Sequence, residues 1–243
     1  MIPSKALLLI DGLFNFHTLR LLQIDEKQVP WSKIFNSLPL LGQGQTWEAI
    51  WFRPNRVEEI HISGNYFSKW DTFQILIRKK YVQISDKLES QFKHGNLPVF
   101  FQEEIEITQW YLNSWLQQVR RFKNQEEMFF DKLARKYRNI RISRPGILQV
   151  DAYQRKVLIE RKTTNAISVQ IGQAAFDPAY DKIILFGEVK GLYKAIRIAK
   201  DQGKVIFGVG YSKGECWGIP TWYSSHSEIM DMNYQLNLSS FVT

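Results

Sequence analysis

The stretch Asp181–Gly210 reads DKIILFGEVKGLYKAIRIAKDQGKVIFGVG, and its pattern is typical of a strand, a helix and a second strand. Apolar runs predict strands over Lys182–Phe186 and Val205–Val209, with an amphipathic helix over Leu192–Asp201 between them. Continuous apolar runs are typical of parallel strands that are buried on both faces. Ligands of such sheets bind beyond the carboxyl ends of the strands, so the turn Gly187–Gly191 is where we expect a site.

The N-terminus repeats this arrangement of a strand followed by a polar turn. The run Lys5–Ile10 (KALLLI) predicts a buried strand that ends at Asp11 and Gly12, before a stretch with helical spacing. A carboxylate at this position serves an α/β active site, or it caps the helix that follows. Asn15 is expected near the same edge. Both interpretations of the aspartate stay open from this stretch alone.

The positive charge of the chain is concentrated in one segment. The net charge of the 243 residues is +8, and residues 120–162 alone hold thirteen Lys and Arg against five Asp and Glu. This segment therefore accounts for the whole excess, and concentrated positive charge favours a polyanionic partner such as nucleic acid over a merely solvated helix face. The basic residues we expect to contact nucleic acid are Arg120, Arg121, Lys132, Arg135, Lys136, Arg138, Arg161 and Lys162.

Between about residues 42 and 105 the sequence pattern changes. Strand-like runs alternate with breakers there, and Phe73–Ile84 predicts an extension or hairpin with basic residues at its tip. We interpret the segment as an insertion into a single domain that covers 1–243. Its aromatic residues pack in a core, stack on bases or contact a protein partner, the first being the commonest use of such residues. They are Trp51, Phe52, Tyr66, Phe67 and Trp70.

The rest of the chain predicts mainly helix and then strands. Glu104–Asn139 has apolar residues at three- to four-residue spacing, and Leu148–Tyr153 with Val157–Glu160 predicts a strand pair. Residues 224–232 predict a short closing helix. The single Cys216 excludes an internal disulfide. No run approaches 18 apolar residues, so we expect no membrane span and a cytoplasmic location.

Several of these segments resemble, in order, the NYN domain of the PIN-like ribonuclease superfamily. The resemblance rests on IDG at Ile10–Gly12, a basic helical middle, ERKTTNAISVQI at Glu160–Ile171, YDKIILF at Tyr180–Phe186 and LYKAIRIAKDQGKVIFGV at Leu192–Val209. It covers roughly 1–20 and 125–235. It implies a three-layer α/β/α domain with a mainly parallel central sheet. In that family, acids at the carboxyl edge of the sheet bind Mg²⁺ or Mn²⁺ for phosphodiester hydrolysis.

The chain departs from the family at most of its acidic positions. Asp11 matches the first family acid, whereas Asn165 and Gln170 stand where two others are usual. Counting back from the glycine after the helix places Val189 and Gly191 at the remaining two. Neutral amides offer oxygens but do not balance a dication. The resemblance therefore implies a nucleic-acid-binding protein, with RNA favoured over DNA, whose metal-nuclease site is degenerate.

Three alternatives remain. In the first, Asp11 acts as a metal ligand with Glu188 or Glu160, beside Lys190, and the protein is an Mg²⁺- or Mn²⁺-dependent ribonuclease. The second rests on Asp151, Glu160 and Lys162, a set similar to the acid and Glu-x-Lys core of PD-(D/E)XK nucleases. The third is a scaffold that binds a protein through the aromatic-rich middle. Fold alone does not decide among them, because function depends on the site.

Overall fold

The chain divides into two compact units in a computed structural model that describes residues 5–42, 45–187, 191–213, 216–217 and 232–241. Unit 1 comprises Met1–Asn55, Met128–Gly146 and Glu160–Thr243, and unit 2 comprises Arg56–Glu127 and Ile147–Ile159. The expected insertion at about 42–105 overlaps unit 2. Unit 2 begins at Arg56, later than the insertion, and it continues beyond residue 105 to Glu127. It also includes Ile147–Ile159.

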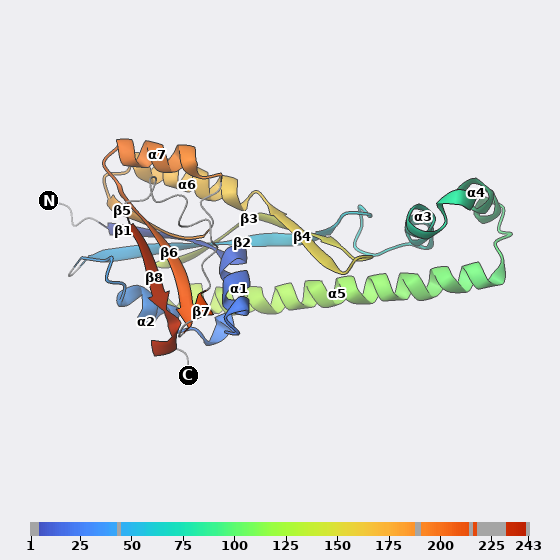
Figure 1. The fold of residues 1–243 in the computed structure, drawn as a ribbon, viewed down its shortest axis with the longest axis horizontal. Helices are drawn as coiled ribbons and strands as arrows, with labels where there is room; N and C mark the ends of the chain where they lie inside the picture. Colours follow the sequence, from blue (N-terminus) through green and yellow to red (C-terminus); the bar gives the residue numbers. More distant parts are fainter. Residues whose placement is uncertain (1–4, 43–44, 188–190, 214–215, 218–231, 242–243) are drawn as a thin grey trace. The chain divides into compact units, whose positions relative to one another are not determined.

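One mixed, mainly parallel sheet of eight strands is formed by the described residues, in the order β4-β3-β2-β1-β5-β6-β7 with β8 also paired to β6 (Figure 1). β1 pairs in parallel with β2 and β5, β6 pairs in parallel with β5 and β8, and β7 is antiparallel to β6. The predicted α/β class with a mainly parallel sheet is thus confirmed. The strands are β1 Lys5–Asp11, β2 Thr46–Glu59, β3 Ile140–Asp151, β4 Lys156–Arg161, β5 Tyr180–Phe186, β6 Val205–Lys213, β7 Cys216–Trp217 and β8 Met232–Asn237.

The stretch Asp181–Gly210 folds as its pattern predicts. β5 and β6 contain the two expected strands, and α7 (Tyr193–Asp201) lies between them in the chain. Gly203 follows the helix with a φ of 78°, in the left-handed region that glycine adopts without strain. The strand–helix–strand unit is therefore confirmed to within a few residues.

Alternate residues of a strand point to opposite sides of the sheet. In unit 1, helices cover both faces of β1 and β5. Leu7 and Leu9 pack with α6 (Thr163–Phe176) and α7, which lie side by side in Figure 1. Leu8 and Ile10 pack on the other face with residues of α1, α2 and the C-terminal end of α5. The bounds are α1 Gly12–Leu21, α2 Trp31–Asn36 and α5 Val99–Lys136.

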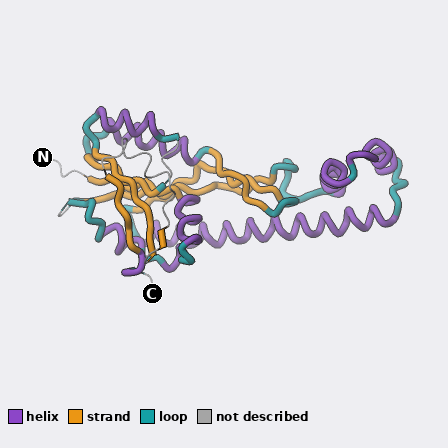
Figure 2. Tube along the Cα trace, in the orientation of Figure 1, coloured by secondary structure: helices purple, strands orange, loops and turns teal. Residues whose placement is uncertain are grey.

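α5 is one uninterrupted helix (Figure 2). Its 38 residues confirm the helical prediction from Glu104 to Lys136 and extend it to Val99, whereas residues 137–139 lie beyond its end. β3 and β4 confirm the predicted strand pair, although β3 begins eight residues before Leu148. Residues 224–231 of the predicted closing helix lie outside the described residues, and Met232 begins β8. Among the described helices, none combines the length and the apolar character that a membrane span needs.

Unit 2 corrects one prediction. Phe73–Ile84 is not an extension or hairpin, because α3 (Lys69–Lys80) is a helix and a 3-10 turn (Val82–Ile84) follows it. The apolar residues of α3 recur at helical spacing and pack against α4 (Ser85–Lys93) and the start of α5. This small core consists of Phe73, Leu76, Ile77, Leu88, Leu97, Phe101 and Ile105.

Candidate functional site

Asp11 lies at the carboxyl edge of β1, where the sequence places it. Its Oδ1 accepts hydrogen bonds from the backbone N–H groups of Leu13 (3.1 Å) and Phe14 (3.0 Å), so the carboxylate caps α1. The end of β5 is close, since a Cβ added to Gly187 would lie 2.8 Å from the Cβ of Asp11. The capping interpretation is confirmed, and a role of Asp11 in metal binding or catalysis stays a prediction.

The acids expected to assist Asp11 cannot be placed beside it. Glu188 and Lys190 lie outside the described residues, and Glu160 belongs to β4 with its side chain outside the described part. Asn165 is exposed in the first turn of α6. Gln170, one turn further along, accepts a hydrogen bond from the Arg141 guanidinium at 3.4 Å.

Asn15 is buried in a polar network inside unit 1. Its amide donates to the carboxylate of Glu26, and its oxygen accepts from the Tyr211 hydroxyl. Glu26 Oε2 is in turn 3.5 Å from a guanidinium nitrogen of Arg53, and that guanidinium lies 3.9 Å from the centre of the Phe130 ring. Side chains so enclosed hold the core together, and the structure provides no access to Asn15 for a ligand.

The three residues of the PD-(D/E)XK interpretation do not belong to one unit. Asp151 ends β3 in unit 2, whereas Glu160 and Lys162 belong to unit 1. Lys162 is exposed and directly precedes α6, with a φ of 81°. The structure therefore describes Asp151 in a different setting, beside Glu59 and His61 of unit 2.

Of the eight predicted basic residues, Lys132 and Lys136 line a common groove. Arg120 donates to the backbone carbonyl of Asn65, and Arg121 is exposed in the same unit. The side chain of Arg161 lies outside the described part. Three of the eight are exposed in unit 1 but do not line the groove, namely Arg135, Arg138 and Lys162.

The groove has a volume of about 840 Å³ and lies between α2 and the C-terminal end of α5, within unit 1. Four lysines line it, and no Asp or Glu is found among the described residues of its wall; we call it the lysine groove. Apolar and small polar residues make up the remainder. The complete lining is Lys27, Val29, Pro30, Trp31, Ser32, Lys33, Asn36, Ser37, Phe129, Lys132, Leu133, Lys136 and Tyr137.

The helical repeat explains why the lysines face this groove. Lys132 and Lys136 are four residues apart, so they lie on one face of α5, next to the apolar stripe that packs on the core. Lys33 is exposed on α2, and Lys27 belongs to the short 3-10 helix Glu26–Gln28 before it. Two segments that are about a hundred residues apart in the chain thus contribute the charge.

Three of the four lysine charges of the groove are available to a ligand. Among the described residues, Lys33, Lys132 and Lys136 form no ion pair with a carboxylate. The Lys136 ammonium lies 5.3 Å from the centre of the Tyr137 ring, which leaves its charge uncompensated. Uncompensated positive charges around a hollow raise the local concentration of anions.

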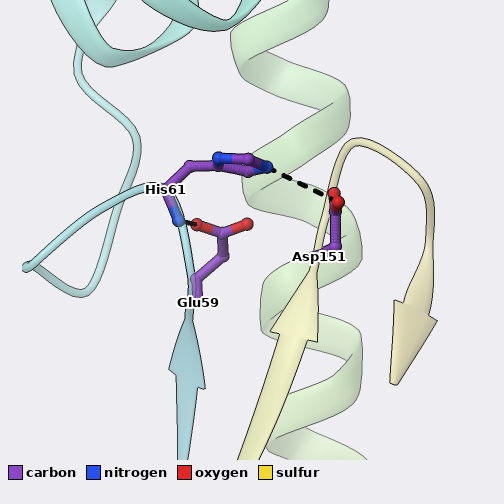
Figure 3. Close-up of side chains that lie close together, drawn as sticks. All are labelled: Glu59, His61 and Asp151. Carbon is purple, nitrogen blue, oxygen red and sulfur yellow. Dashed lines mark hydrogen bonds and ion pairs between the residues drawn. The ribbon is translucent and has the colours of Figure 1, made fainter. Parts of the chain in front are cut away.

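A second cluster of side chains lies in unit 2, where Glu59, His61 and Asp151 each direct one potential ligand atom to within 4.8 Å of the others (Figure 3). Burial raises the pKa of the Glu59 carboxyl above its usual range, although the backbone N–H groups of Ala152 and His61 oppose the rise. The sequence pattern predicted Asp151 with Glu160 and Lys162, and neither Glu59 nor His61 was among the predicted site residues. The only local signal is the pair Glu59-x-His61 in a strand-like run.

Comparison of the chain with protein-family models, with curated proteins and with solved structures found no match. The resemblance to the NYN domain therefore rests on the motifs at Ile10–Gly12 and Glu160–Val209 and stays a prediction. The side-chain geometry of the lysine groove and of the cluster in unit 2 carries the functional argument.

Proposed function

We propose that this protein binds single-stranded nucleic acid, RNA in preference to DNA, in the lysine groove of unit 1. The observation that carries the proposal is the convergence of four lysines on one hollow whose described wall has no acid. Phosphates of a nucleic-acid backbone are the commonest polyanions that such a surface attracts. The preference for RNA rests on the resemblance to the PIN-like ribonuclease superfamily, whose three-layer NYN arrangement is part of this proposal.

The groove also offers surfaces for bases. Phe129 and Tyr137 are half-buried in its wall, and every base has a π-face that stacks on an aromatic ring. A rigid duplex does not bring its bases to such rings, whereas a single strand does. The combination of lysines and partly exposed rings therefore supports a single strand as the ligand.

Binding without cleavage is the activity we propose. Asp11 caps α1, and the resemblance puts amides at the two family acid positions that fall on α6, namely Asn165 and Gln170. A hydrolytic site for Mg²⁺ or Mn²⁺ needs several carboxylates around the ions. We therefore expect a labelled RNA to remain intact in Mn²⁺, and EDTA to leave its binding unchanged.

Fluorescence anisotropy with a labelled single-stranded RNA of about 12 nucleotides tests binding, within the range of site sizes of single-strand binders. We expect tighter binding of this RNA than of the matching single-stranded DNA, and weaker binding of a duplex RNA. Tighter binding of the duplex would contradict the proposal.

Protection of lysines from acetylation locates the site. Bound RNA should protect Lys27, Lys33, Lys132 and Lys136, whereas Lys87 and Lys93 on α4 serve as exposed controls that stay reactive. Mass spectrometry of the acetylated protein with and without RNA reads out both sets. Equal protection of both sets of lysines, or protection of the α4 lysines alone, would contradict RNA binding in the lysine groove.

A further inference from the structure

The cluster in unit 2 joins the ends of two neighbouring strands. Glu59 is the last residue of β2, His61 follows it by two residues, and Asp151 is the last residue of β3. The backbone N–H of Ile60 donates to the carbonyl of Val150 at 3.1 Å, which holds the two strand ends together. Figure 3 shows the His61 ring extending from the segment after β2 toward the Asp151 carboxylate.

Backbone donors orient both carboxylates of the cluster. Glu59 accepts the N–H of Ala152 at 3.1 Å on Oε1 and the N–H of His61 at 2.5 Å on Oε2. Asp151 accepts the N–H of Gln154 at 2.9 Å on Oδ1, so its Oδ2 faces the imidazole. Each carboxylate oxygen has more than one lone pair, so a bound ion does not displace these donors. Metal ligands in proteins are held by hydrogen bonds of this kind.

The imidazole has a nitrogen that needs a partner. Nε2 of His61 is buried and has no hydrogen bond among the described residues, and Oδ2 of Asp151 lies 3.5 Å from it. That separation is long for a hydrogen bond. It equals, to within a few tenths of an ångström, the roughly 3.4 Å between two ligands that each lie about 2.1 Å from a tetrahedral ion.

Two of the three side chains of the cluster are buried carboxyl groups. Glu59 and Asp151 are 4 % and 2 % exposed, and buried carboxylates need compensating positive charge. A divalent ion bound by the imidazole and both carboxylates would supply positive charge at this position.

We propose that Glu59, His61 and Asp151 form a Zn²⁺ site that fastens the end of β2 to the end of β3 in unit 2. The ligand atoms are one oxygen of Glu59, Nε2 of His61 and Oδ2 of Asp151, and a water molecule completes a four-coordinate shell. The Glu59 oxygen lies within 4.8 Å of the other two atoms, so reaching the tetrahedral spacing shortens these distances by at most roughly 1.4 Å.

The donor set selects zinc over the hard cations. Imidazole nitrogen suits Zn²⁺ and other transition ions, whereas Mg²⁺ and Ca²⁺ prefer six or more oxygen ligands. Three protein ligands are too few for Ca²⁺, and the burial of both carboxylates leaves little room for the waters that Mg²⁺ retains. The proposal is independent of RNA binding, because no residue of the site lines the lysine groove.

Calorimetric titration of the tag-free, EDTA-treated full chain with Zn²⁺ tests the site. We expect one ion per chain with micromolar or tighter affinity, a rise in melting temperature on addition of Zn²⁺, and no comparable effect of Mg²⁺. Co²⁺ bound to the wild-type chain should give the intense visible absorption of a tetrahedral site. Absence of Zn²⁺ binding, or an octahedral Co²⁺ spectrum, would overturn the proposal.

Two ligand variants and two controls locate the ion. Asp151→Asn keeps the Oδ1 acceptor for Gln154 and removes the charge, and His61→Gln removes the imidazole. Each should weaken Zn²⁺ binding at least tenfold, since even substitution of a residue that only hydrogen-bonds to a metal ligand lowers metal affinity by about 10- to 100-fold. His94→Gln, at an exposed histidine of the same unit, and Cys216→Ser, at the single cysteine, should bind as the wild type does. Unchanged affinity in both ligand variants would contradict the assignment.

Discussion

At the scale of single residues, the buried network of unit 1 shows how an ionisable pair is made tolerable inside a core. Glu26 and Arg53 are 3 % and 5 % exposed, and they lie 3.5 Å apart at their closest charged atoms. Asn15 donates to the carboxylate, and the Phe130 ring lies against the guanidinium. A buried pair adds little net stability, but removal of one partner leaves an uncompensated charge.

Arg53→Met should therefore lower the free energy of unfolding by about 3 kcal/mol, because the Glu26 carboxylate stays buried without its cation. Arg56→Met is the control: its guanidinium pairs with Glu58 in solvent, at 65 % side-chain exposure, and its loss should have an effect of less than about 1 kcal/mol. Urea denaturation measures both. Similar losses in the two variants would show that the buried pair has no special role.

Glu48 provides the pH dependence that belongs to this scale. Hydrogen bonds from the Lys5 ammonium (2.7 Å) and from the Tyr180 hydroxyl (2.6 Å) lower the pKa of its carboxyl below the usual 4.5. Because the pKa is lower in the folded state, the stabilisation is complete above the unfolded pKa and is lost as pH falls through the folded one. The side chains of Lys5 and Glu48 are each 41 % exposed, so the effect is modest.

Glu48→Gln should be less stable than the wild type at neutral pH by less than about 1 kcal/mol, and the difference should shrink as pH falls below 4.5. Thermal unfolding at a series of pH values gives the comparison. A difference that grows on acidification would mean that the sign of the pKa shift is wrong.

At the scale of elements, local signals explain which predictions held. The strand–helix–strand unit of Asp181–Gly210 was predictable because both strands are short apolar runs and the helix between them is amphipathic. α3 was missed because the run in Phe73–Ile84 is rich in apolar and β-branched residues, which short patterns do not assign. The decisive signal was the capping box: Ser68 and Asp71 bond each other's backbone N–H groups at the start of α3.

Two glycines test how closely the helices approach their neighbours, because one lies against another element and the other does not. A Cβ on Gly12, the first residue of α1, would lie 2.5 Å from the backbone oxygen of Phe52 in β2, whereas a Cβ on Gly172 in α6 would meet no atom within 4 Å. Gly12→Ala should destabilise by about 1–3 kcal/mol through overpacking. Gly172→Ala should stabilise by about 0.5–1 kcal/mol, because alanine loses less backbone entropy in a helix. Equal effects in chemical denaturation would contradict the packing of α1 against β2.

At the scale of the whole molecule, charge and topology together define the proposed RNA site. The sequence predicted a basic segment over residues 120–162, and it identified Lys132 and Lys136. It could not show which basic residues converge, because Lys27 and Lys33 come from a part of the chain whose local charge is unremarkable. The cluster of Glu59, His61 and Asp151 was hidden for the same reason, since only the pairing of strand ends brings Asp151 to the other two.

The salt dependence of RNA binding tests the lysine groove most directly. For single strands the slope of log affinity against log salt is about −0.7 per phosphate neutralised, so four lysines give a slope of about −2.8. Between about 50 and 200 mM salt, the double variant Lys132→Gln/Lys136→Gln should bind RNA more weakly and with a slope smaller by about 1.4. Lys87→Gln/Lys93→Gln, which removes the same charge from α4, should keep the wild-type slope. An unchanged slope in the first variant, or an equal loss in both, would contradict binding in the lysine groove.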